Sequence, residues 1–404
     1  MRIAVIGGGW AGIAAAVELT AAGVDTTLFE AGRVLGGRAR SVSLGGRVLD
    51  NGQHILLGAY RDTLALMRKV GADPDTLFDR RPLQVIDSSG FRLSLPRLPA
   101  PLNVAWGLLA ARGLGFGEKL RTAWWMECVK RRGFRLPGDM TVAEWLDGAG
   151  QTGVLRRRLW EPLCLAALNT PAERASAQLF ANVLRDSLGS PRREDTDLLL
   201  PRVPLGQLLP EPAGRWLTTH GACIRLRHRV RTLARQTDSI QVDDQPFDAA
   251  VLAVAPQHAA TLWPEAAVPN GFEPIATVYL QYPPDIKLPF PLQSLSGRLG
   301  QWVVDRGDGL LACVLSGHGD WEACDDAALA HALDAELRIG APLLGASTIR
   351  EKRATFAATP DLHRPDPQNG RLHIAGDYAW SDYPATLEGA IRSGLRAAHA
   401  ILGN

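Results

Sequence analysis

The feature that most constrains the fold is a glycine-rich turn between an apolar segment and a helix-forming segment near the start of the chain. Residues 2–6 (RIAVI) have the continuous apolar character of a strand buried in a parallel sheet. Residues 7–12 (GGGWAG) contain the spacing GxGxxG, and residues 13–22 predict an Ala-rich helix. Residues 24–29 predict a second strand, which Glu30 follows. This order of strand, glycine turn, helix, strand and acid is typical of a dinucleotide-binding unit.

Each residue of this unit has an expected role in holding a nucleotide. Gly7 permits the tight turn, Gly9 lets a pyrophosphate approach the backbone, and Gly12 lets helix and strand pack closely. The helix N-terminus offers free N–H groups and the positive end of its dipole to the phosphates. Glu30 would accept hydrogen bonds from the ribose hydroxyls. Because strand, helix and acid accompany the motif, we favour a nucleotide site over a glycine turn in another α/β protein.

A second glycine-containing segment follows Glu30. Gly36 and Gly37 again allow close backbone approach, and Arg38 can reach a phosphate with two parallel hydrogen bonds. On its own, this segment is more typical of a surface loop with an exposed arginine. Its position directly after a nucleotide-binding acid favours the phosphate role.

The far end of the chain carries a similar pattern. Residues 371–375 (RLHIA) predict a strand, Gly376 and Asp377 follow at once, and residues 386–402 predict a helix. Asp377 can bind a ribose or ribityl hydroxyl. The N–H groups near Leu387 can face an oxygen that gains negative charge. The sequence therefore predicts that both ends of the chain contribute to one site.

Composition limits the partners and the compartment. The net charge of +2 gives no electrostatic footprint for nucleic acid. The five cysteines are scattered without a CxxC pair, which argues against a disulfide framework or a zinc site and favours a reducing compartment. The first residues lack a basic leader and a cleavage site, and no apolar run reaches the length of about 18 residues that a spanning helix needs. We therefore expect a cytoplasmic protein without a metal.

The middle of the chain predicts a second domain. Residues from about 100 to 190 predict helices, one of them capped by Thr141 with Glu144 at the capping-box spacing. Residues 276–281 and 310–315 alternate like strands of a substrate-domain sheet. At 404 residues, two domains are the natural expectation.

The strands and helices together predict an α/β fold with a Rossmann-like nucleotide-binding domain and a mixed-sheet substrate domain. Strands expected at residues 224–231 and 249–253 would belong to the first domain. We assign residues 1–58, 200–260 and 365–404 to the nucleotide-binding domain, and residues 59–199 and 261–364 to the substrate domain with its helical insertion at about 100–190.

Residues 100–135 combine aromatic and basic side chains. Trp106, Trp124 and Trp125 lie among several Lys and Arg residues. Such a segment suits contact with a membrane surface, here the inner face of the cell membrane. A helical substrate domain with a buried Trp pair explains the segment nearly as well. Both interpretations hold together if one helix lines a cavity and also lies on lipid.

These motifs resemble those of the flavin-containing amine oxidase and carotenoid desaturase superfamily, and the resemblance covers both ends of the chain. The matching segments are residues 7–12, 30, 36–38, 376–377 and 386–390. Residues 50–58 (DNGQHILLG) and 160–170 (WEPLCLAALNT) look like the squalene-associated branch. The resemblance implies a Rossmann-like FAD-binding domain. It also implies non-covalent FAD, because no Cys lies near the start of the last helix.

The resemblance also implies which residues contact FAD. Arg38 and the glycines would face the pyrophosphate, and Val230, in a strand over residues 227–231, would bind adenine through its backbone. Asp377 would hold the ribityl chain, and Leu387 would lie under the isoalloxazine. The full expected set is Gly7, Gly9, Trp10, Ala11, Gly12, Glu30, Ala31, Gly37, Arg38, Gln53, His54, Val230, Gly376, Asp377, Thr386 and Leu387.

The reaction implied by the branch is reductive removal of the allylic hydroxyl of hydroxysqualene, which gives squalene and water in hopanoid biosynthesis. It needs a proton donor and a dry apolar pocket. His54 is the first candidate donor, because its loop should lie beside the flavin. Glu161 is the second, because a carboxyl group in an apolar helix can stay neutral. A His54 that only packs its loop and an ion-paired Glu161 are the alternatives. The electron donor is not identified by the sequence.

Three other functions fit the same motifs. An FAD-dependent desaturase of a polyisoprenoid such as phytoene would use the same fold with electrons flowing the other way. An amine or protoporphyrinogen oxidase would produce peroxide with its substrate. A non-catalytic lipid-binding flavoprotein would hold flavin whose redox state no lipid changes.

Overall fold

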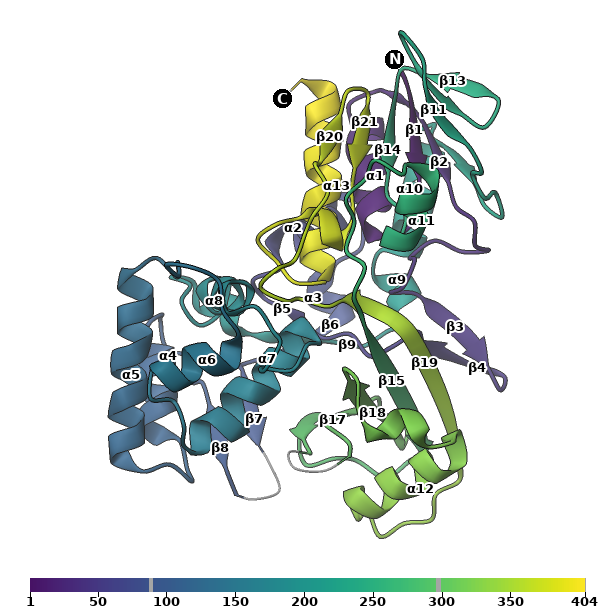
Figure 1. The fold of residues 1–404 in the computed structure, drawn as a ribbon. Helices are drawn as coiled ribbons and strands as arrows, with labels where there is room; N and C mark the ends of the chain where they lie inside the picture. Colours follow the sequence, from purple (N-terminus) through teal and green to yellow (C-terminus); the bar gives the residue numbers. More distant parts are fainter. Residues whose placement is uncertain (87–89, 296–298, 404) are drawn as a thin grey trace.

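A six-stranded sheet made from both ends of the chain forms one half of the molecule in the computed structural model (Figure 1). The structure describes residues 1–86, 90–295 and 299–403. The strand order is β10-β2-β1-β14-β21-β20, and all strands run parallel except β20. The bounds are β1 (Arg2–Ile6), β2 (Asp25–Phe29), β10 (Cys223–Arg225), β14 (Ala249–Leu252), β20 (Gln368–Asn369) and β21 (Leu372–Ile374). The α/β class predicted from the sequence is confirmed.

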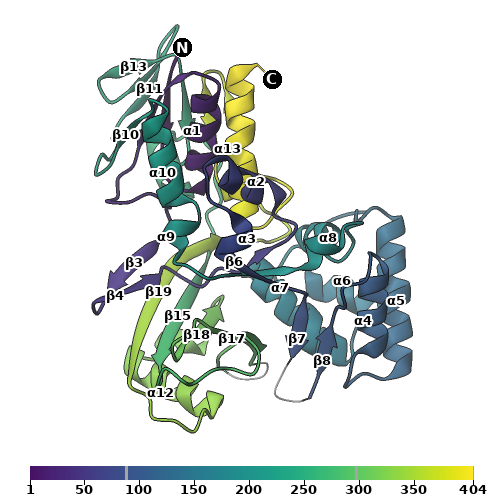
Figure 2. The same ribbon diagram turned by 180° about the vertical axis from the view of Figure 1, so that it is seen from behind.

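Two helices from opposite ends of the chain lie side by side on this sheet (Figure 2). They are α1 (Trp10–Ala21), which begins three residues earlier than expected, and α13 (Leu387–Leu402). A Cβ on Gly394 would lie only 2.1 Å from the carbonyl oxygen of Ala11, so the two helices touch at backbone distance. The same half contains α9 (Leu205–Leu208), α10 (Pro210–Thr219), α11 (Pro256–Leu262) and the sheet β11 (Leu233–Arg235), β12 (Ile240–Val242), β13 (Gln245–Phe247).

A five-stranded antiparallel sheet forms the second half. Its order is β16-β17-β18-β15-β19, so β19 is an edge strand. The bounds are β15 (Phe272–Gln281), β16 (Leu292–Ser294), β17 (Trp302–Asp305), β18 (Leu310–Ser316) and β19 (Gly345–Phe356). Leu329 and Leu333 of α12 (Asp326–Leu337) are fully buried and pack in one cluster with the apolar residues of this sheet.

A helical lobe lies beside this second half (Figures 1 and 2). It contains α4 (Leu102–Ala110), α5 (Phe116–Arg131), α6 (Val142–Gly148), a π-helix (Arg156–Trp160), α7 (Glu161–Leu168) and α8 (Ala177–Asp186), beside the hairpin β7 (Gln84–Ile86) and β8 (Arg92–Ser94). Residues 81–95 predict this hairpin, because two strand-like runs flank residues 87–90. The strand pairing is confirmed, and residues 87–89 lie outside the described residues. The capping box of Thr141 and Glu144 is also confirmed. Trp125 packs edge-on against Trp145 and Trp160 at ring distances of 4.9 and 5.4 Å.

The remaining elements are short. They are β3 (Ser41–Leu44), β4 (Arg47–Asp50), β5 (Leu56–Leu57), α2 (Arg61–Lys69), α3 (Pro74–Leu77), β6 (Phe78–Arg81), β9 (Leu198–Pro201) and the 3₁₀ turns Arg193–Thr196, Asp320–Ala323 and Asp377–Ala379. Within the described ranges, no helix is both long enough and apolar enough to cross a membrane.

The strand expected over residues 224–231 is wrong beyond Arg225. Arg227 adopts φ +55°, a left-handed conformation that ends the extended chain. The N–H groups of Arg227 and His228 then donate to the carbonyl oxygens of Gly32 and Glu30, at 2.8 and 2.9 Å. Val230 therefore lies in an irregular segment rather than in a strand.

Candidate active site

Both ends of the chain line one large cavity. Its volume is about 1190 Å³, above the range of about 300–1000 Å³ that is typical of small-molecule pockets. Fifteen of the sixteen residues expected to contact FAD lie on its wall. The sixteenth, Gly12, lies outside the wall, and a Cβ there would be 1.9 Å from the carbonyl oxygen of Gly7. Gly12 thus makes the close helix–strand contact that its position in the motif predicts.

Two glycine loops meet at the N-terminus of α1. Gly9 and Gly36 form a β-bridge, and the Gly36 N–H donates to the carbonyl oxygen of Gly8 at 2.8 Å. Helix α1 begins after Gly9, which has no side chain to cap it. Gly9, Trp10 and Ala11 lie on the cavity wall, so the first turn of α1 presents backbone at the cavity. Uncapped N–H groups in a glycine cradle fit a pyrophosphate.

Glu30 is fixed by the same loops. Its two carboxylate oxygens accept hydrogen bonds from the backbone N–H groups of Gly8 and Gly32, at 2.7 and 2.6 Å. A carboxylate has about four lone-pair positions, so acceptor capacity remains for ribose hydroxyls. Ala31 and Val230 lie on the same stretch of wall. This region fits the adenosine part of a dinucleotide.

Arg38 and Asp377 form an ion pair on the cavity wall. The Arg38 Nη2 atom lies 2.6 Å from Asp377 Oδ1, and Nη1 donates to the carbonyl oxygen of Ala354 at 2.7 Å. Burial opposes the charge of Arg38, but the charge of Asp377 and the hydrogen bond to it outweigh burial and raise the pKa of Arg38. The pair joins the second glycine loop to the turn after β21.

The start of α13 is held from the side away from the cavity. Thr386 caps the helix by accepting from the Gly389 N–H at 3.0 Å, and Thr386 and Leu387 lie on the cavity wall. The buried Glu388 carboxylate accepts from the N–H and Oγ1 of Thr63 at 3.0 and 2.7 Å. Burial raises the pKa of Glu388, although Thr63 and Arg392 oppose that shift.

Gln53 and His54 lie in the loop between β4 and β5, and both line the cavity. The Nδ1 atom of His54 lies 3.1 Å from the carbonyl oxygen of Gly52 and therefore carries the proton in this contact. Burial, reinforced by Arg38, lowers the pKa of His54, so the ring is neutral near pH 7 with Nε2 unprotonated. The buried Oε1 of Gln53 has no hydrogen-bond partner in the described part of the chain. It is therefore available to a ligand.

Glu161 is not brought into this site. Its carboxylate pairs with Arg156 Nε at 2.6 Å. It lines a separate small pocket of about 260 Å³. An ion-paired and partly exposed carboxylate does not meet the condition of a neutral acid in an apolar setting, on which its candidacy depends.

Tyr60 and Tyr383 lie on the cavity wall and were not singled out from the sequence. Burial raises the pKa of both Tyr60 and Tyr383, so both are neutral phenols. The Tyr383 hydroxyl donates to Asp186, which lies on the same wall. The only available signal was that each tyrosine lies just beyond a family-like motif, over residues 50–58 or 386–390.

The other half of the cavity is mostly apolar. Its wall includes Leu159, Leu163, Ala166, Val183, Leu292, Val304 and Val314, which come from the helical lobe and the five-stranded sheet. A wall of this kind excludes water and suits a hydrocarbon ligand.

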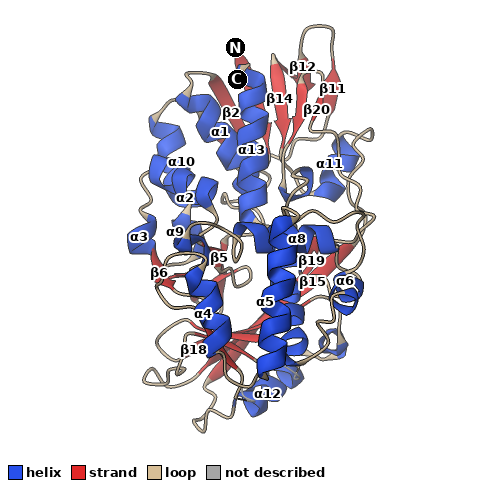
Figure 3. Cartoon of the chain, turned by 90° about the vertical axis from the view of Figure 1, so that its left-hand side faces the viewer, coloured by secondary structure: helices blue, strands red, loops and turns tan. Residues whose placement is uncertain are grey.

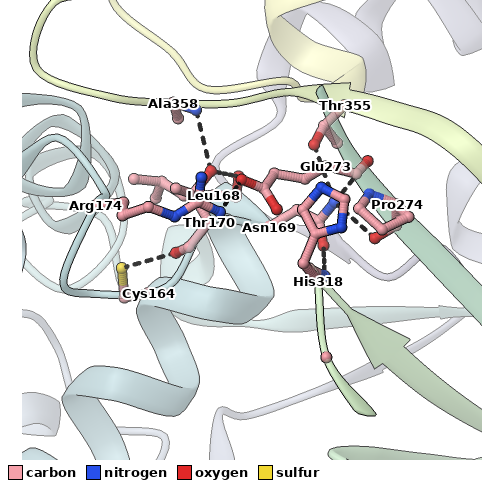
Figure 4. A network of polar contacts seen from close by, with 12 residues as sticks. Cys164, Leu168, Asn169, Thr170, Arg174, Glu273, Pro274, His318, Thr355 and Ala358 are labelled. Carbon is pink, nitrogen blue, oxygen red and sulfur yellow. Dashed lines mark hydrogen bonds and ion pairs between the residues drawn. The ribbon is translucent and has the colours of Figure 1, made fainter. Parts of the chain in front are cut away.

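Asn169 holds the helical lobe against this sheet (Figure 4). It ends α7 with φ +50°, its amide donates to Thr355 Oγ1 at 2.9 Å, and its Oδ1 accepts from the Gly317 N–H at 2.8 Å. Beside it, the fully buried Glu273 of β15 pairs with Arg174. Asn169 itself lies on the cavity wall, so this network links α7 to the five-stranded sheet at the cavity.

The fold and the nucleotide loops define a class, and comparison with known proteins identifies it. The family model for flavin-containing amine oxidoreductases matches residues 10–402, so the chain belongs to this family. It is an FAD-dependent oxidoreductase.

Within the class, the chain resembles proteins named hydroxysqualene dehydroxylase. It is 32% identical to that of Rhodopseudomonas palustris over 98% of this chain and 97% of the relative. It is 30% identical to that of Sinorhizobium fredii over 99% and 98%.

More distant similarities extend to other members of the superfamily. A probable zeta-carotene desaturase of Synechococcus elongatus is 24% identical over 100% of this chain and 98% of the relative. The solved structure of cyclohexylamine oxidase from Brevibacterium oxydans IH-35A is 18% identical, has a TM-score of 0.72, and is matched over 100% of this chain and 98% of that chain. At this identity the structural similarity shows the fold alone.

Proposed function

We propose that this protein reductively removes the allylic hydroxyl of hydroxysqualene and yields squalene and water in hopanoid or isoprenoid biosynthesis. Similarity over nearly the whole length to relatives named hydroxysqualene dehydroxylase carries the proposal. The apolar half of the cavity supports it, because a C30 hydrocarbon chain needs an apolar wall beside the redox group.

The reaction is balanced by two electrons and two protons. The C–O bond breaks, one proton joins the departing hydroxyl as water, and a hydride takes its place on carbon. When bound, reduced FAD supplies that hydride. The chain must bind the cofactor, donate a proton to the hydroxyl and exclude water from the allylic cation.

The residues that would hold FAD are those of the nucleotide half of the cavity. The N-terminus of α1 and Gly37 would bind the pyrophosphate, and Glu30 would bind the adenosine ribose. Asp377 would bind the ribityl chain, with Arg38 keeping its carboxylate in place. The start of α13 at Leu387 would face the isoalloxazine. We expect the cofactor to be non-covalent, because no Cys lies near the start of α13.

His54 is the proposed proton donor. Its Nδ1 is committed to the Gly52 carbonyl, so the transferable proton must lie on Nε2. Because burial lowers the pKa of His54, the protonated ring is a stronger acid than an exposed histidine, but it is less populated at pH 7. Glu161 is not proposed, because it lies outside the cavity and is paired with Arg156.

The test is a single turnover under anaerobic conditions. Holoenzyme reduced with dithionite and freed of excess reductant is mixed with hydroxysqualene, while flavin absorbance and lipid products are followed by spectroscopy and mass spectrometry. We expect one squalene per reoxidised flavin. Glu161→Gln should match the wild type, whereas His54→Gln should be slow. Reoxidation without squalene, or no reoxidation at all, would exclude the reaction.

The similarity to a carotenoid desaturase supports a second candidate function, the desaturation of a polyisoprenoid. In that case a phytoene-like precursor would bleach the oxidised flavin of the enzyme, and hydroxysqualene would not reoxidise the reduced flavin. Rapid peroxide formation with an amine or with protoporphyrinogen would indicate an oxidase. Flavin that no substrate reduces or reoxidises would leave a lipid-binding flavoprotein.

A further inference from the structure

One outer surface of the helical lobe is unusually apolar. Of the thirteen large apolar residues that are exposed in the described part of the chain, six lie on α4 or α5. They are Leu102, Trp106 and Leu109 of α4, and Phe116, Leu120 and Trp124 of α5. We call these six residues the α4–α5 face. Exposed apolar side chains gathered in this way mark an interaction surface.

The spacing of these residues places them on one side of each helix. In α4 they are separated by four and three positions, and in α5 by four and four. The opposite sides are buried: Asn103 and Gly107 face inward from α4, and Trp125 and Val129 from α5. The pair Trp124 and Trp125 is divided, with 67% and 7% of their surfaces exposed. Figure 3 shows α4 and α5 side by side on the outside of the lobe.

The charges around the α4–α5 face are mostly positive. Between residues 92 and 135 the chain has nine Lys or Arg residues and two Glu residues. The carboxylate of Glu118 accepts from the Leu155 N–H, and that of Glu127 pairs with Arg131. Exposed basic residues flank the face at Arg97, Arg112 and Arg121. Because the whole chain has a net charge of only +2, this excess is local.

We propose that the α4–α5 face binds the surface of a membrane that contains anionic lipids. Trp, Phe and Leu side chains enter the boundary between headgroups and acyl chains, and Lys and Arg side chains contact the anionic headgroups. The charge excess matches this partner better than it matches a second copy of the chain, because two copies would bring like charges together.

The α4–α5 face lies close to the cavity wall, so membrane binding there would bring the cavity near the bilayer. Helix α4 packs on β8, whose partner strand β7 contributes Gln84 and Val85 to the cavity wall. Asn103, on the buried side of α4, donates to Thr196 at 3.4 Å, and Thr196 also lines the cavity. A lipid substrate would therefore leave the bilayer close to the wall that receives it. This last step rests on the proposed function, whereas membrane binding does not.

The test compares two leucines of similar exposure. Leu120, on the face, is 56% exposed, and Leu344, far from it in sequence, is 60% exposed. Holoenzyme and the variants Leu120→Glu and Leu344→Glu are sedimented with vesicles of phosphatidylcholine alone or with phosphatidylglycerol, at low and high salt. Circular dichroism and flavin absorbance confirm that each variant is folded and loaded.

We expect wild type and Leu344→Glu to bind the anionic vesicles, more weakly at high salt. We expect Leu120→Glu to partition at least about tenfold less, because it replaces an apolar side chain that would enter the lipid with a negative charge. Equal binding of the two variants, or no binding of wild type, would overturn the proposal. So would a wild-type dimer in light scattering that Leu120→Glu separates, because the face would then join two copies. Squalene formation from substrate in detergent micelles is measured separately, so that failure of the reaction is distinguished from failure of docking.

Discussion

At the scale of single residues, the ion pair between Arg38 and Asp377 shows how two separate sequence signals become one structural unit. The sequence predicts each residue as an independent cofactor contact. In the structure their side chains meet at 2.6 Å across 339 positions of chain. The pairing means that the Asp377 carboxylate is oriented before any ligand arrives, and preorganisation of this kind reduces the free-energy cost of binding.

Asp377→Asn is therefore expected to weaken FAD binding by about 10- to 100-fold, since hydrogen bonds to charged groups contribute about 1.5–3 kcal/mol. Fluorescence titration of apoenzyme with FAD measures this dissociation constant. Glu127→Gln breaks the exposed pair with Arg131 and should leave FAD affinity unchanged, because the pair lies on the surface, where water and salt screen it. Unaltered affinity in Asp377→Asn would contradict the assigned role.

His54 gives a prediction about pH. The donor must be protonated, and burial lowers its pKa below the ordinary value of about 6.5. The rate of flavin reoxidation by hydroxysqualene should therefore rise as the pH falls below about 6.5, and His54→Gln should abolish this rise and slow the reaction by about 10²–10⁴-fold. Stopped-flow measurements from pH 5 to 8 provide the profile.

His258 is the matched control for His54. It also lies on the cavity wall, and burial, reinforced by Arg229 and Arg353, also lowers its pKa. His258→Gln should keep the pH profile of the wild type. A profile in His54→Gln that retains its acid limb would remove His54 from the reaction.

Residue positions that follow from a local motif could be predicted, whereas contacts that depend on distant partners could not. The glycine loops and Glu30 form their hydrogen bonds within about thirty residues of sequence, so the motif already contains the geometry. Glu161 could be either a neutral acid or an ion-paired carboxylate, and the sequence does not decide between these two. The structure shows the ion pair with Arg156. Tyr60 and Tyr383 reach the cavity only through packing of the whole fold.

At the scale of elements, the contact between α1 and α13 positions the first residues of both helices at the cavity wall. We expect Gly394→Ala to destabilise the protein by about 1–3 kcal/mol, because the new Cβ would meet the Ala11 carbonyl at 2.1 Å and push α13 away. FAD affinity should fall as well, since Leu387 begins the same helix. Urea unfolding and FAD titration measure the two effects.

Gly117 provides the control for this substitution. It lies in α5, and a Cβ there would have no neighbour within 4 Å. Gly117→Ala should leave FAD affinity unchanged and stabilise the helix by about 0.5–1 kcal/mol, because Ala loses less backbone entropy on folding. If Gly394→Ala and Gly117→Ala had the same effects on stability and on FAD affinity, close packing of α1 against α13 would not be what positions the start of α13.

Asn169 is the element-scale link between α7 and the five-stranded sheet. Asn169→Ala should cost about 2–4 kcal/mol of unfolding free energy, since several buried groups, among them the Gly317 N–H, lose their partner. Asn369, whose bonds to Arg235 and Glu265 are exposed, is the control and should change stability by less than about 0.5 kcal/mol. Equal losses of unfolding free energy at Asn169 and Asn369, measured by urea unfolding, would show that the Asn169 network contributes no more to stability than exposed hydrogen bonds do.

Elements with a strong period were predicted well, and elements without one were missed. The predicted helix over residues 386–402 is α13 with its cap. Helix α10 was missed because Pro210 and Pro212 suggest a loop, although the first turn of a helix tolerates proline. Strand β19 was missed because it is a half-exposed edge strand, whose charged residues hide the alternation.

At the scale of the whole molecule, the cavity joins segments that are far apart in sequence. Its wall runs from Ile6 to Ala390 and includes both sheets and the helical lobe. FAD bound there would contact the first and the last strand–helix units at once. A ligand that binds only the folded state stabilises every part of the structure that must be folded for binding. The cofactor should therefore stabilise both halves of the chain and not one half alone.

We therefore expect the whole chain to unfold in one cooperative transition, and FAD to shift that transition for both halves together. FAD at 100 times its dissociation constant should add about 2.7 kcal/mol to the free energy of unfolding of the apoenzyme. Tryptophan fluorescence, which includes Trp125, Trp145 and Trp160 of the helical lobe, should shift together with far-ultraviolet circular dichroism. Adenosine monophosphate at the same concentration should shift both signals less, because it reaches only the loops around Glu30. If FAD moved the circular dichroism transition and left the tryptophan transition in place, the two halves would fold independently, and the cavity would not be the structural link between them.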